Sequence, residues 1–335
     1  MRNRLISAGF IGFNNHAERI RRIVEKSQKV QIDVVYHPTK KLNHSKSSNK
    51  FEQLKKCDVV FILSPNNTHF HYLELFSKDY KGYIYCEKPP VSSLEELEKL
   101  RLLSLDPTKV FFNFQLRFSS LRELLEKSIE DGSIGDPLNC FISSTQGLAY
   151  KKNYVNSWRA DIRQHPNGIA ETKAIHYIDL LFLLFGSPVE YSYKPTNRTN
   201  NGTAFDTCHF SLTFKNGLIA NLIMSYAAPL TFEFNFLGTN GILKYRSDSL
   251  TLKTPRDSFD ERGFFIEPSE KIRIKPKGIE SDFTQDSLEK SLEYFLAYTL
   301  QNKNLPRELF EQSLNTNHFI PVSYTHLTLP TIYSV

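Results

Sequence analysis

The chain has 335 residues, of which 40% are hydrophobic and 23% charged; this composition excludes a mainly disordered protein, and the length favours two domains. No apolar run reaches the roughly 20 residues that a membrane span needs. Basic residues outnumber acidic ones by 42 to 36, but no nucleic-acid-binding motif accompanies them. The expected partners are therefore small molecules, including anionic ones, rather than nucleic acid or membrane.

The cysteines lie far apart in the sequence, as Cys57, Cys86, Cys140 and Cys208. Because no two of them have the CxxC spacing, we expect neither a metal site nor a disulfide framework. Reduced thiols are typical of cytoplasmic proteins, and the cytoplasm is the compartment that we expect for this chain.

From residue 4 to about 113, short apolar runs alternate with amphipathic stretches, which is typical of strand–helix–strand units. The predicted strands are 5–12, 31–37, 58–65, 82–87 and 109–114, and the predicted helices are 16–27, 51–56, 69–78 and 93–104. This pattern predicts an N-terminal Rossmann domain over 1–119, with a doubly wound parallel sheet. Ligands of such sheets bind at the carboxyl ends of the strands.

After residue 120 the pattern changes. Helices are predicted at 121–131 and 170–184, and alternating runs follow at 206–214, 217–226, 231–237 and 241–253. Strands without intervening helices indicate a mainly antiparallel, open sheet in a second, α+β domain over 120–321. The Asn-Gly pairs at 216–217 and 240–241 predict tight hairpin turns.

The segment 322–331, VSYTHLTLPT, matches the translation of a transposase adaptor used in preparing DNA libraries. We therefore interpret 322–335 as a non-native tail and exclude it from reasoning about the fold. The alternative is a genuine irregular tail. In either case the preceding helix is expected to begin near Pro306.

The segment from Gly9 to Ala17 follows the first predicted strand and opens a helix, where a dinucleotide-binding turn belongs. Gly12 would make the tight turn, and Asn14 stands where a glycine usually lets the backbone approach the pyrophosphate. Gly9, Gly12, Phe13 and Asn14 are thus candidate cofactor residues. A purely structural turn is the alternative.

The second predicted strand ends in Tyr36-His37-Pro38, followed by Lys40 and Lys41. An acidic residue usually holds the ribose hydroxyls of NAD at this point, whereas nearby basic residues suit the 2′-phosphate of NADP. His37 and Lys40 are candidate cofactor residues. Lysines after a strand are also commonly just solvated, so the cofactor is predicted as NAD or NADP.

Two further strand ends carry polar residues. Ser64, Pro65, Asn66 and His69 follow the third strand, where a dinucleotide would pass, although simple helix capping also explains them. Glu87-Lys88-Pro89 follows the fourth strand. A lysine there can donate to a substrate oxygen or relay a proton.

Taken in order, these motifs resemble the glucose-fructose oxidoreductase and inositol dehydrogenase family, Gfo/Idh/MocA. The resemblance rests on 9–17, 65–69, 87–89, 113–118, 158–161 and 168–179, and extends to about residue 321. It implies an NAD(P)-dependent oxidoreductase that transfers a hydride between nicotinamide and a hydroxyl or keto carbon of a sugar, cyclitol or nucleotide-sugar. It also implies a homo-oligomer, either a dimer or a tetramer.

The resemblance also implies roles for individual residues. His176 corresponds to the base that removes the hydroxyl proton, although a histidine with a structural role on a half-buried helix is the alternative. Lys88 binds and polarises the oxygen, and Glu87 and Lys88 also border the cofactor. The implied substrate-binding residues are Asn113, Arg117, Trp158, Thr172 and Asp179, the last of which we expect to be structural rather than catalytic.

Thr172 departs from the family pattern, because many members have an aspartate there that pairs with the histidine. On an α-helix the neighbouring Glu171 could not replace it, since one residue turns the side chain by about 100°. Three features motivate an alternative function: Thr172, Asn14 in the glycine turn, and the absence of an acidic residue for the ribose hydroxyls after the second strand. The alternative is a catalytically silent relative that binds a dinucleotide or sugar as a sensor or structural partner. The presence of both Lys88 and His176 argues against it.

Overall fold

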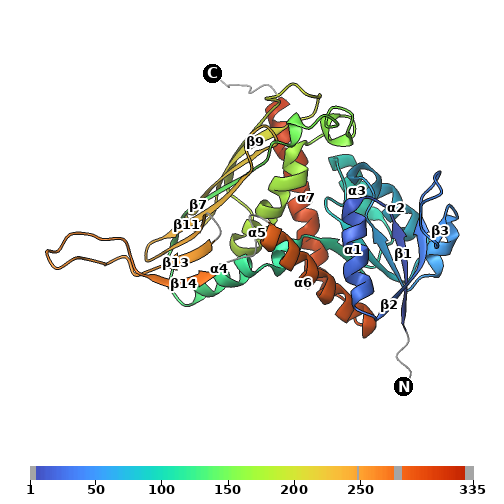
Figure 1. Ribbon diagram of the computed structural model, residues 1–335, viewed down its shortest axis with the longest axis horizontal. Coiled ribbons are helices and arrows are strands. Elements are labelled where there is room, and N and C mark those ends of the chain that lie inside the picture. The colour runs from blue at the N-terminus through green and yellow to red at the C-terminus, as the bar shows by residue number, and fades with distance from the viewer. Residues whose placement is uncertain (1–4, 247–248, 275–280, 329–335) are drawn as a thin grey trace. The chain divides into compact units, whose positions relative to one another are not determined.

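The structure is a computed structural model that describes the backbone of residues 5–246, 249–274 and 281–328. It comprises two compact units (Figure 1). The first contains the chain up to Phe114 together with Glu289–Pro321, and the second contains Gln115–Leu288. Side chains are described throughout these ranges except at 246, 281–285 and 321–328.

The first unit is built on a six-stranded, wholly parallel sheet in the order β3-β2-β1-β4-β5-β6. Its strands are β1 (Ile6–Ile11), β2 (Val30–Tyr36), β3 (Ser47–Ser48), β4 (Val59–Ile62), β5 (Tyr83–Glu87) and β6 (Val110–Asn113). The predicted Rossmann-type sheet is confirmed, and only the two-residue β3 was not predicted. Strands β2 and β3 lie on one side of β1, and β4, β5 and β6 lie on the other, so the strand order reverses at β1. Ligands of such folds bind in the crevice beyond the carboxyl end of the strands at this reversal.

Helices α1 (Asn15–Lys26), α2 (His69–Ser77) and α3 (Leu94–Leu102) connect these strands. In α1 the apolar residues Ile20 and Val24 are buried one turn apart, whereas Arg21 pairs with Glu18 on a more exposed side. The segment predicted as a helix at 51–56 is the 3₁₀ helix η1 (Phe51–Lys56). A second 3₁₀ turn, η2 (Asn66–Thr68), leads into α2.

The C-terminal segment returns to the first unit through α6 (Ser281–Leu300) and α7 (Arg307–Thr328). Phe295 of α6 is fully buried, and its ring centroid lies 5.3 Å from that of Tyr85 and 6.0 Å from that of Phe61. The structure thus differs from the predicted division at 119/120: the chain divides after Phe114, and 289–321 joins the first unit. The reason is that aromatic side chains late in the sequence cover the parallel sheet.

The second unit contains an eight-stranded sheet in the order β14-β13-β12-β11-β7-β10-β9-β8. Its strands are β7 (Pro137–Thr145), β8 (Glu190–Thr196), β9 (Thr207–Thr213), β10 (Ile219–Ser225), β11 (Thr231–Gly238), β12 (Ile242–Arg246), β13 (Ser249–Lys253) and β14 (Glu270–Ile274). Every neighbouring pair is antiparallel except β7 and β10, which confirms the predicted sheet type. The two Asn-Gly turns join β9 to β10 and β11 to β12, as predicted.

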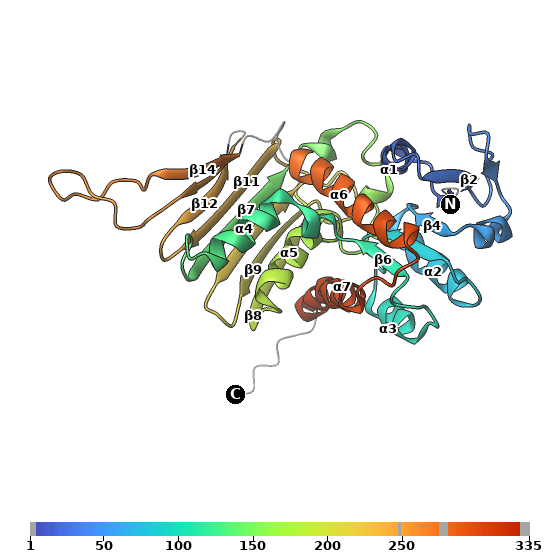
Figure 2. The same ribbon diagram turned by 90° about the horizontal axis from the view of Figure 1, so that it is seen from below.

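Helices cover one face of this sheet (Figure 2). They are α4 (Ser120–Glu130), a π-helical turn (Ala170–Ala174) and α5 (Ile175–Phe185). Phe232, Phe234 and Phe236 of β11 are buried on the covered face, and Phe185 of α5 stacks on Phe236 at 5.8 Å. The residues between them in β11 alternate to the opposite, more open face.

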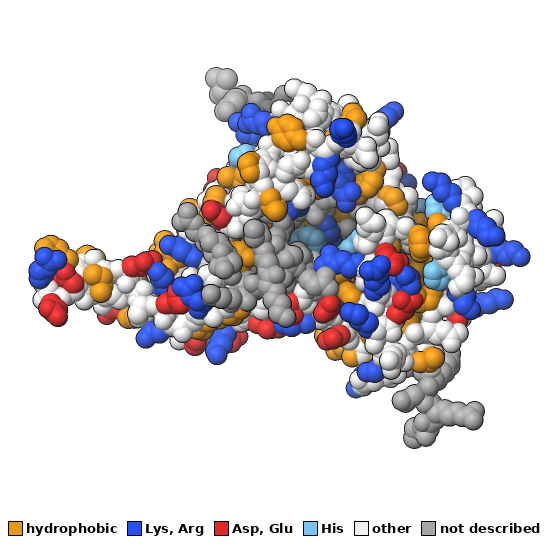
Figure 3. Space-filling view, in the orientation of Figure 1, with side chains coloured by type: hydrophobic (Ala, Val, Ile, Leu, Met, Phe, Trp, Pro, Cys, Tyr) orange, Lys and Arg blue, Asp and Glu red, His pale blue; other side chains and the backbone are white. Residues whose placement is uncertain are grey.

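An irregular arm, residues 254–269, connects β13 to β14 and projects from the sheet (Figures 1 and 3). Phe259 and Phe265 contact each other near its tip, with ring centroids 4.9 Å apart. Phe264 and Phe265 are 64% and 82% exposed. Large apolar side chains that project in this way are candidates for contacts with another molecule.

Two sequence predictions concern the ends of the molecule. The backbone of α7 continues to Thr328, so it includes the first residues of the predicted tail 322–335. Residues 329–335 lie outside the described residues, as do the side chains of 321–328. Among the described helices, none is both long and apolar enough to cross a membrane.

Candidate active site

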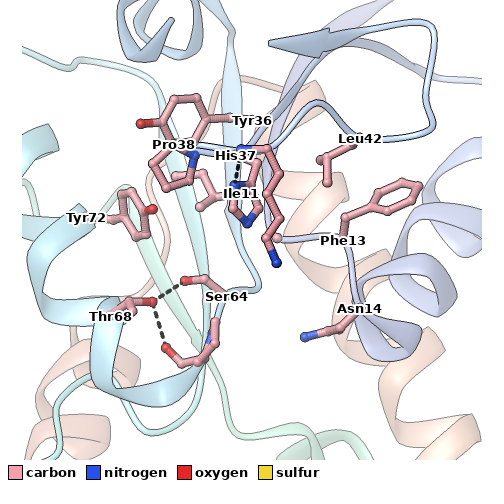
Figure 4. A pocket seen from close by; sticks show the side chains of 13 residues that line it. Ile11, Phe13, Asn14, Tyr36, His37, Pro38, Leu42, Ser64, Thr68 and Tyr72 are labelled. Carbon is pink, nitrogen blue, oxygen red and sulfur yellow. Dashed lines mark hydrogen bonds between the residues drawn. The ribbon is translucent and has the colours of Figure 1, made fainter. Parts of the chain in front are cut away.

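A pocket of about 390 Å³ lies at the carboxyl ends of β1, β2 and β4 (Figure 4). It is lined by Ile11, Gly12, Phe13, Asn14, Tyr36, His37, Pro38, Lys40, Leu42, Ser64, Pro65, Thr68 and Tyr72. The predicted cofactor residues that line it are Gly12, Phe13, Asn14, His37, Lys40, Ser64 and Pro65. The structure therefore brings together residues from three separate stretches of the sequence.

Gly12 makes the turn between β1 and α1, with a φ of +104°. A Cβ atom at this position would lie 2.6 Å from the carbonyl oxygen of Leu63, so both the conformation and the space require glycine. Gly9, by contrast, lies within β1, where a Cβ would meet the Leu54 side chain at 2.6 Å. Gly9 thus serves the packing of η1 on the sheet and does not line the pocket.

Asn14 is the N-cap residue of α1. Its Oδ1 accepts the backbone N–H of Ala17 at 2.8 Å, and its Nδ2 donates to the carbonyl oxygen of Leu63 at 3.4 Å. Both ends of the Asn14 amide thus bond to backbone groups, one of α1 and one of the segment after β4. The N-terminus of α1 carries a partial positive charge, which suits a phosphate. The turn thus fits the pyrophosphate of a dinucleotide although its middle glycine is replaced.

Polar groups from the segment between β4 and α2, and from α2 itself, line the opposite side of the pocket (Figure 4). The Thr68 Oγ1 lies 2.6 Å from Ser64 Oγ and 2.7 Å from the Pro65 carbonyl oxygen. Burial, with a smaller contribution from Tyr36, raises the pKa of Tyr72 to about 12. Burial also raises the pKa of Tyr36. Both phenols are therefore neutral hydrogen-bonding groups at neutral pH.

His69 and Asn66, both predicted cofactor residues, do not line this pocket. The His69 ring is fully buried, with Nδ1 2.8 Å from the Pro89 carbonyl and Nε2 2.8 Å from the Ser64 carbonyl. Burial lowers the pKa of His69, although the two carbonyls favour the protonated ring. The neutral ring can donate to one of them, and it braces the two loops that follow β4 and β5.

Glu87, at the end of β5, is the centre of a polar network. Its Oε1 lies 3.0 Å from His16 Nε2 and accepts from Asn113 Nδ2 at 2.8 Å, and Asn113 Oδ1 accepts from Ser291 Oγ at 3.0 Å. Burial would raise the pKa of Glu87, but His16, Asn113 and Lys88 together lower it. The carboxylate is therefore ionised. It holds the strand end that precedes the half-buried Lys88.

In the second unit, Thr172 lies in the π-helical turn that precedes α5, and His176 lies in α5. His176 is half-buried in its first turn. The Thr172 hydroxyl lies 2.7 Å from the hydroxyl of Tyr226. Neighbouring Glu171 is buried and accepts from Asn167 Nδ2 at 2.9 Å, and its other oxygen lies 3.4 Å from His165 Nε2.

The helix entry departs from the predicted α-helix over 170–184, because Ala170–Ala174 form a π-helical turn in which the Ile175 N–H bonds the Ala170 carbonyl. A π-helical turn contains an extra residue compared with an α-helical one. The sequence argument excluded Glu171 as a replacement for an acid at position 172 because it assumed the α-helical angle of 100° per residue. That angle is wrong for a π-helical turn. The Glu171 carboxylate is nevertheless held by Asn167 and His165.

Comparison with known proteins identifies the family of the chain. Residues 6–110 match the model of the "Oxidoreductase family, NAD-binding Rossmann fold", and residues 126–317 match that of the "Oxidoreductase family, C-terminal alpha/beta domain". The chain belongs to the Gfo/Idh/MocA oxidoreductase family. Its first unit thus carries the NAD-binding domain of this family, and the resemblance inferred from the sequence motifs is confirmed.

Relatives in this family are moderately similar. The uncharacterised oxidoreductase YrbE of Bacillus subtilis is 26% identical over 255 residues, 71% of each chain. A myo-inositol 2-dehydrogenase of Thermotoga maritima is 25% identical over 291 residues, 80% of this chain and 83% of the relative. The solved structure of levoglucosan dehydrogenase with NADH and levoglucosan shares the fold, with a TM-score of 0.77 and 19% identity over 96% of this chain and 98% of that chain.

The substrate residues implied by membership of the Gfo/Idh/MocA family fall into two groups. Asn113, Arg117 and Asp179 are fully or almost fully buried, and Asn113 belongs to the Glu87 network. Arg117 donates from Nε and Nη2 to both carboxylate oxygens of Asp179, at 2.8 and 2.6 Å. These contacts favour structural roles for the three residues.

Trp158 and Thr172 form the second group, and both are half-buried. The Trp158 ring lies edge-on to His165, with centroids 4.9 Å apart, and the Arg159 guanidinium lies 4.3 Å above it. Trp158 is thus anchored to the same loop that holds Glu171.

Sequence reasoning missed several residues near the site. Thr68, Tyr72 and His16 are the clearest cases. Thr68 stands within the predicted turn and Tyr72 follows it by one helical turn, so their spacing could have indicated them. His16 had no such signal, because its partner Glu87 is distant in the sequence.

Proposed function

We propose that the chain is an NAD(P)-dependent dehydrogenase or reductase that acts on a CH–OH group of a sugar, cyclitol or nucleotide-sugar. The observation that carries the proposal is the pocket beyond β1, whose glycine turn and helix N-terminus fit a dinucleotide, in the NAD-binding domain of an oxidoreductase family. The myo-inositol and levoglucosan dehydrogenases among its relatives support a polyhydroxylated substrate.

A dinucleotide held beside Gly12, Asn14 and the N-terminus of α1 would supply the hydride acceptor for oxidation of the substrate carbon, or the hydride donor for the reverse reduction. His176 takes the proton of the substrate hydroxyl during oxidation, because imidazole titrates near neutral pH and can both accept and return a proton. Lys88 donates a hydrogen bond to the substrate oxygen. Its ammonium group stabilises the negative charge that develops there as the proton leaves.

Glu87 supports this role of Lys88 from the preceding position. The ionised Glu87 is fixed by His16 and Asn113, so the strand end that carries Lys88 is held by contacts on both sides. We infer that Glu87 positions Lys88 rather than contacting the cofactor.

A second candidate function is favoured by one observation. The hydroxyl of Thr172 pairs with Tyr226, and no carboxylate stands at this position to assist His176. A relative that binds a dinucleotide or sugar without turnover would tolerate this arrangement. The two candidates differ in whether any substrate is converted.

The test is a screen of sugars and cyclitols, including myo-inositol, in which NADH or NADPH absorbance is followed. We expect at least one substrate to be converted, and His176→Ala to lower kcat by about 100-fold or more while dinucleotide affinity is kept. Lys88→Ala should lower kcat similarly. Tight dinucleotide binding without conversion of any substrate would instead favour the silent binder. A gain of turnover in Thr172→Asp would favour an enzyme whose activity is reduced because the acid is missing.

We also propose that the chain forms a homo-oligomer. The open face of the second sheet and the exposed apolar tip of the arm, with Phe264 and Phe265, are surfaces that a second copy could cover. Light scattering after size exclusion should give a mass of two or four chains. A concentration-independent monomer would contradict this proposal.

A further inference from the structure

A second pocket, of about 570 Å³, adjoins the dinucleotide pocket at the end of β2. It is lined by Asp33, Thr39, Lys40, Lys41, Ser45, Lys46, Ser47, Ser48, Asn49, Lys50 and Gln53. Lys40 lines both pockets. The basic side chains of this edge of the first unit are visible in the space-filling view over β2 and β3 (Figure 3). We call residues 37–50 the lysine loop.

The short strand β3 gives the lysine loop its shape. It pairs with the end of β2, the backbone N–H of Val35 donates to the Lys46 carbonyl at 2.9 Å, and that of His37 donates to the Ser48 carbonyl at 3.0 Å. The Ser47 Oγ accepts the backbone N–H of Leu42 at 2.9 Å. The chain therefore folds back on itself, and lysines from both sides of the turn gather around one pocket.

The four lysines of this pocket lack acidic partners. Within the described part of the chain, no carboxylate lies within 4.0 Å of the amino group of Lys40, Lys41, Lys46 or Lys50. The nearby Lys55 differs, because its amino group lies 3.1 Å from both Glu52 and Asp79. Like charges gathered without counter-charges repel one another, and a bound anion relieves this repulsion.

Asp33 is the one carboxylate among the described residues that line this pocket, and its Oδ1 accepts from the Gln31 amide at 2.7 Å. The pocket thus carries a clear excess of positive charge. Its hydroxyl groups, from Thr39 and Ser45 among others, add hydrogen-bond donors that suit phosphate oxygens.

His37 occupies the position where a carboxylate would accept hydrogen bonds from ribose hydroxyls. Its Nδ1 accepts the backbone N–H groups of Thr39 and Lys40, at 3.2 and 3.0 Å. A nitrogen that accepts two hydrogen bonds carries no proton, so the neutral ring is protonated at Nε2. The ring thus offers an N–H donor at the edge of the dinucleotide pocket, where a carboxylate would offer an acceptor and repel a phosphate.

We propose that the lysine loop is a binding site for the 2′-phosphate of NADP(H), and that this chain takes NADPH in preference to NADH. The inference rests on the proposed function, because it assigns a phosphomonoester on the adenosine ribose to a pocket that adjoins the dinucleotide site. Lys40 stands between the two pockets and contacts the phosphate, Lys41 adds a second charge, and His37 donates from Nε2. NADH has only a hydroxyl at this point and gains little from the lysines.

The test is equilibrium binding, measured by titrating NADPH and NADH separately into the purified full chain and following nicotinamide fluorescence. We expect NADPH to bind at least about 10-fold more tightly than NADH, and its affinity to fall more steeply as salt is added, because charge pairs are screened. Competition with 2′,5′-ADP and 5′-ADP should show the same preference for the 2′-phosphate, without any role of the nicotinamide.

Variants assign the preference to the lysine loop. The double variant Lys40→Ala/Lys41→Ala should reduce the preference to about 3-fold or less, with NADH affinity almost unchanged. Lys55→Ala is the matched control, because Lys55 is paired and lines neither pocket. It should keep the wild-type preference.

Equal or tighter binding of NADH in the wild type overturns the inference but leaves the proposed function intact. A preference for NADPH that survives in the double variant overturns the assignment to these lysines. If a folded sample binds neither dinucleotide, the proposed function fails together with the inference.

Discussion

At the scale of single residues, the clearest electrostatic arrangement is the network around Glu87. A buried carboxylate is stable only when charges and donors compensate for lost hydration, and His16 and Asn113 do so here. The sequence indicated Glu87 and Asn113 through family motifs, but neither His16 nor Ser291. These partners come from separate parts of the chain, so only the folded structure reveals them.

Glu87→Gln is expected to lower the free energy of unfolding at pH 7 by roughly 1–3 kcal/mol, because the uncharged amide cannot replace the carboxylate beside His16 and Asn113. The pKa of Glu87 is lower in the folded chain than its ordinary value. Its contribution is therefore fully present above the unfolded pKa and is lost as pH falls through the folded pKa.

Urea unfolding of both proteins at pH 7 and at about pH 4, near the ordinary glutamate value, measures this dependence. The gap in unfolding free energy should narrow at the lower pH. A gap that is equal at both pH values would show that the charge of Glu87 does not matter.

At the scale of elements, regular hydrophobic patterns predicted most of the strands, but they missed the central strand β7, although its burial alternates. Strands β1, β4 and β5 are mostly buried and mostly apolar, so their runs stood out. β8 and β14 lie at the two sheet edges and expose charged residues, which hides their alternation. The π-helical turn before α5 has no recognised sequence signal, because it is one extra residue within an otherwise helical pattern.

Helix α6 illustrates the limit of reading domains from chain order. Its buried Phe295 contacts Tyr85 of β5 and Phe111 of β6, with ring centroids 5.3 and 5.6 Å apart. Such a contact stabilises the first unit through burial of a large aromatic surface. No local sequence pattern in α6 predicts which of the two sheets it covers.

Phe295→Ala is expected to destabilise the protein by roughly 3–5 kcal/mol, because it removes a fully buried ring and leaves a cavity. Tyr294→Ala, at the partly exposed neighbouring position of the same helix, is the control and should cost less. Thermal and urea unfolding of the two variants give the comparison. Equal losses would mean that Phe295 does not anchor α6 to the sheet.

At the scale of the whole molecule, the fold class and the family could be predicted because motifs at strand ends recur in a fixed order. The dinucleotide pocket could be predicted only in part: its glycine turn and Lys40 follow strands, whereas Tyr72 enters it from α2. The catalytic roles proposed for Lys88 and His176 both depend on binding of a dinucleotide at the end of β1.

The measurement that tests this claim most directly is dinucleotide binding, by calorimetry, to the wild type and to Gly12→Ala. The added Cβ would meet the Leu63 carbonyl, whereas Gly217→Ala, at a position with positive φ and no neighbour within 4 Å, is the matched control. The account predicts binding by the wild type and the control, and a loss of about 10-fold or more in a folded Gly12→Ala. Absence of binding to the folded wild type, or full binding by Gly12→Ala, would contradict it.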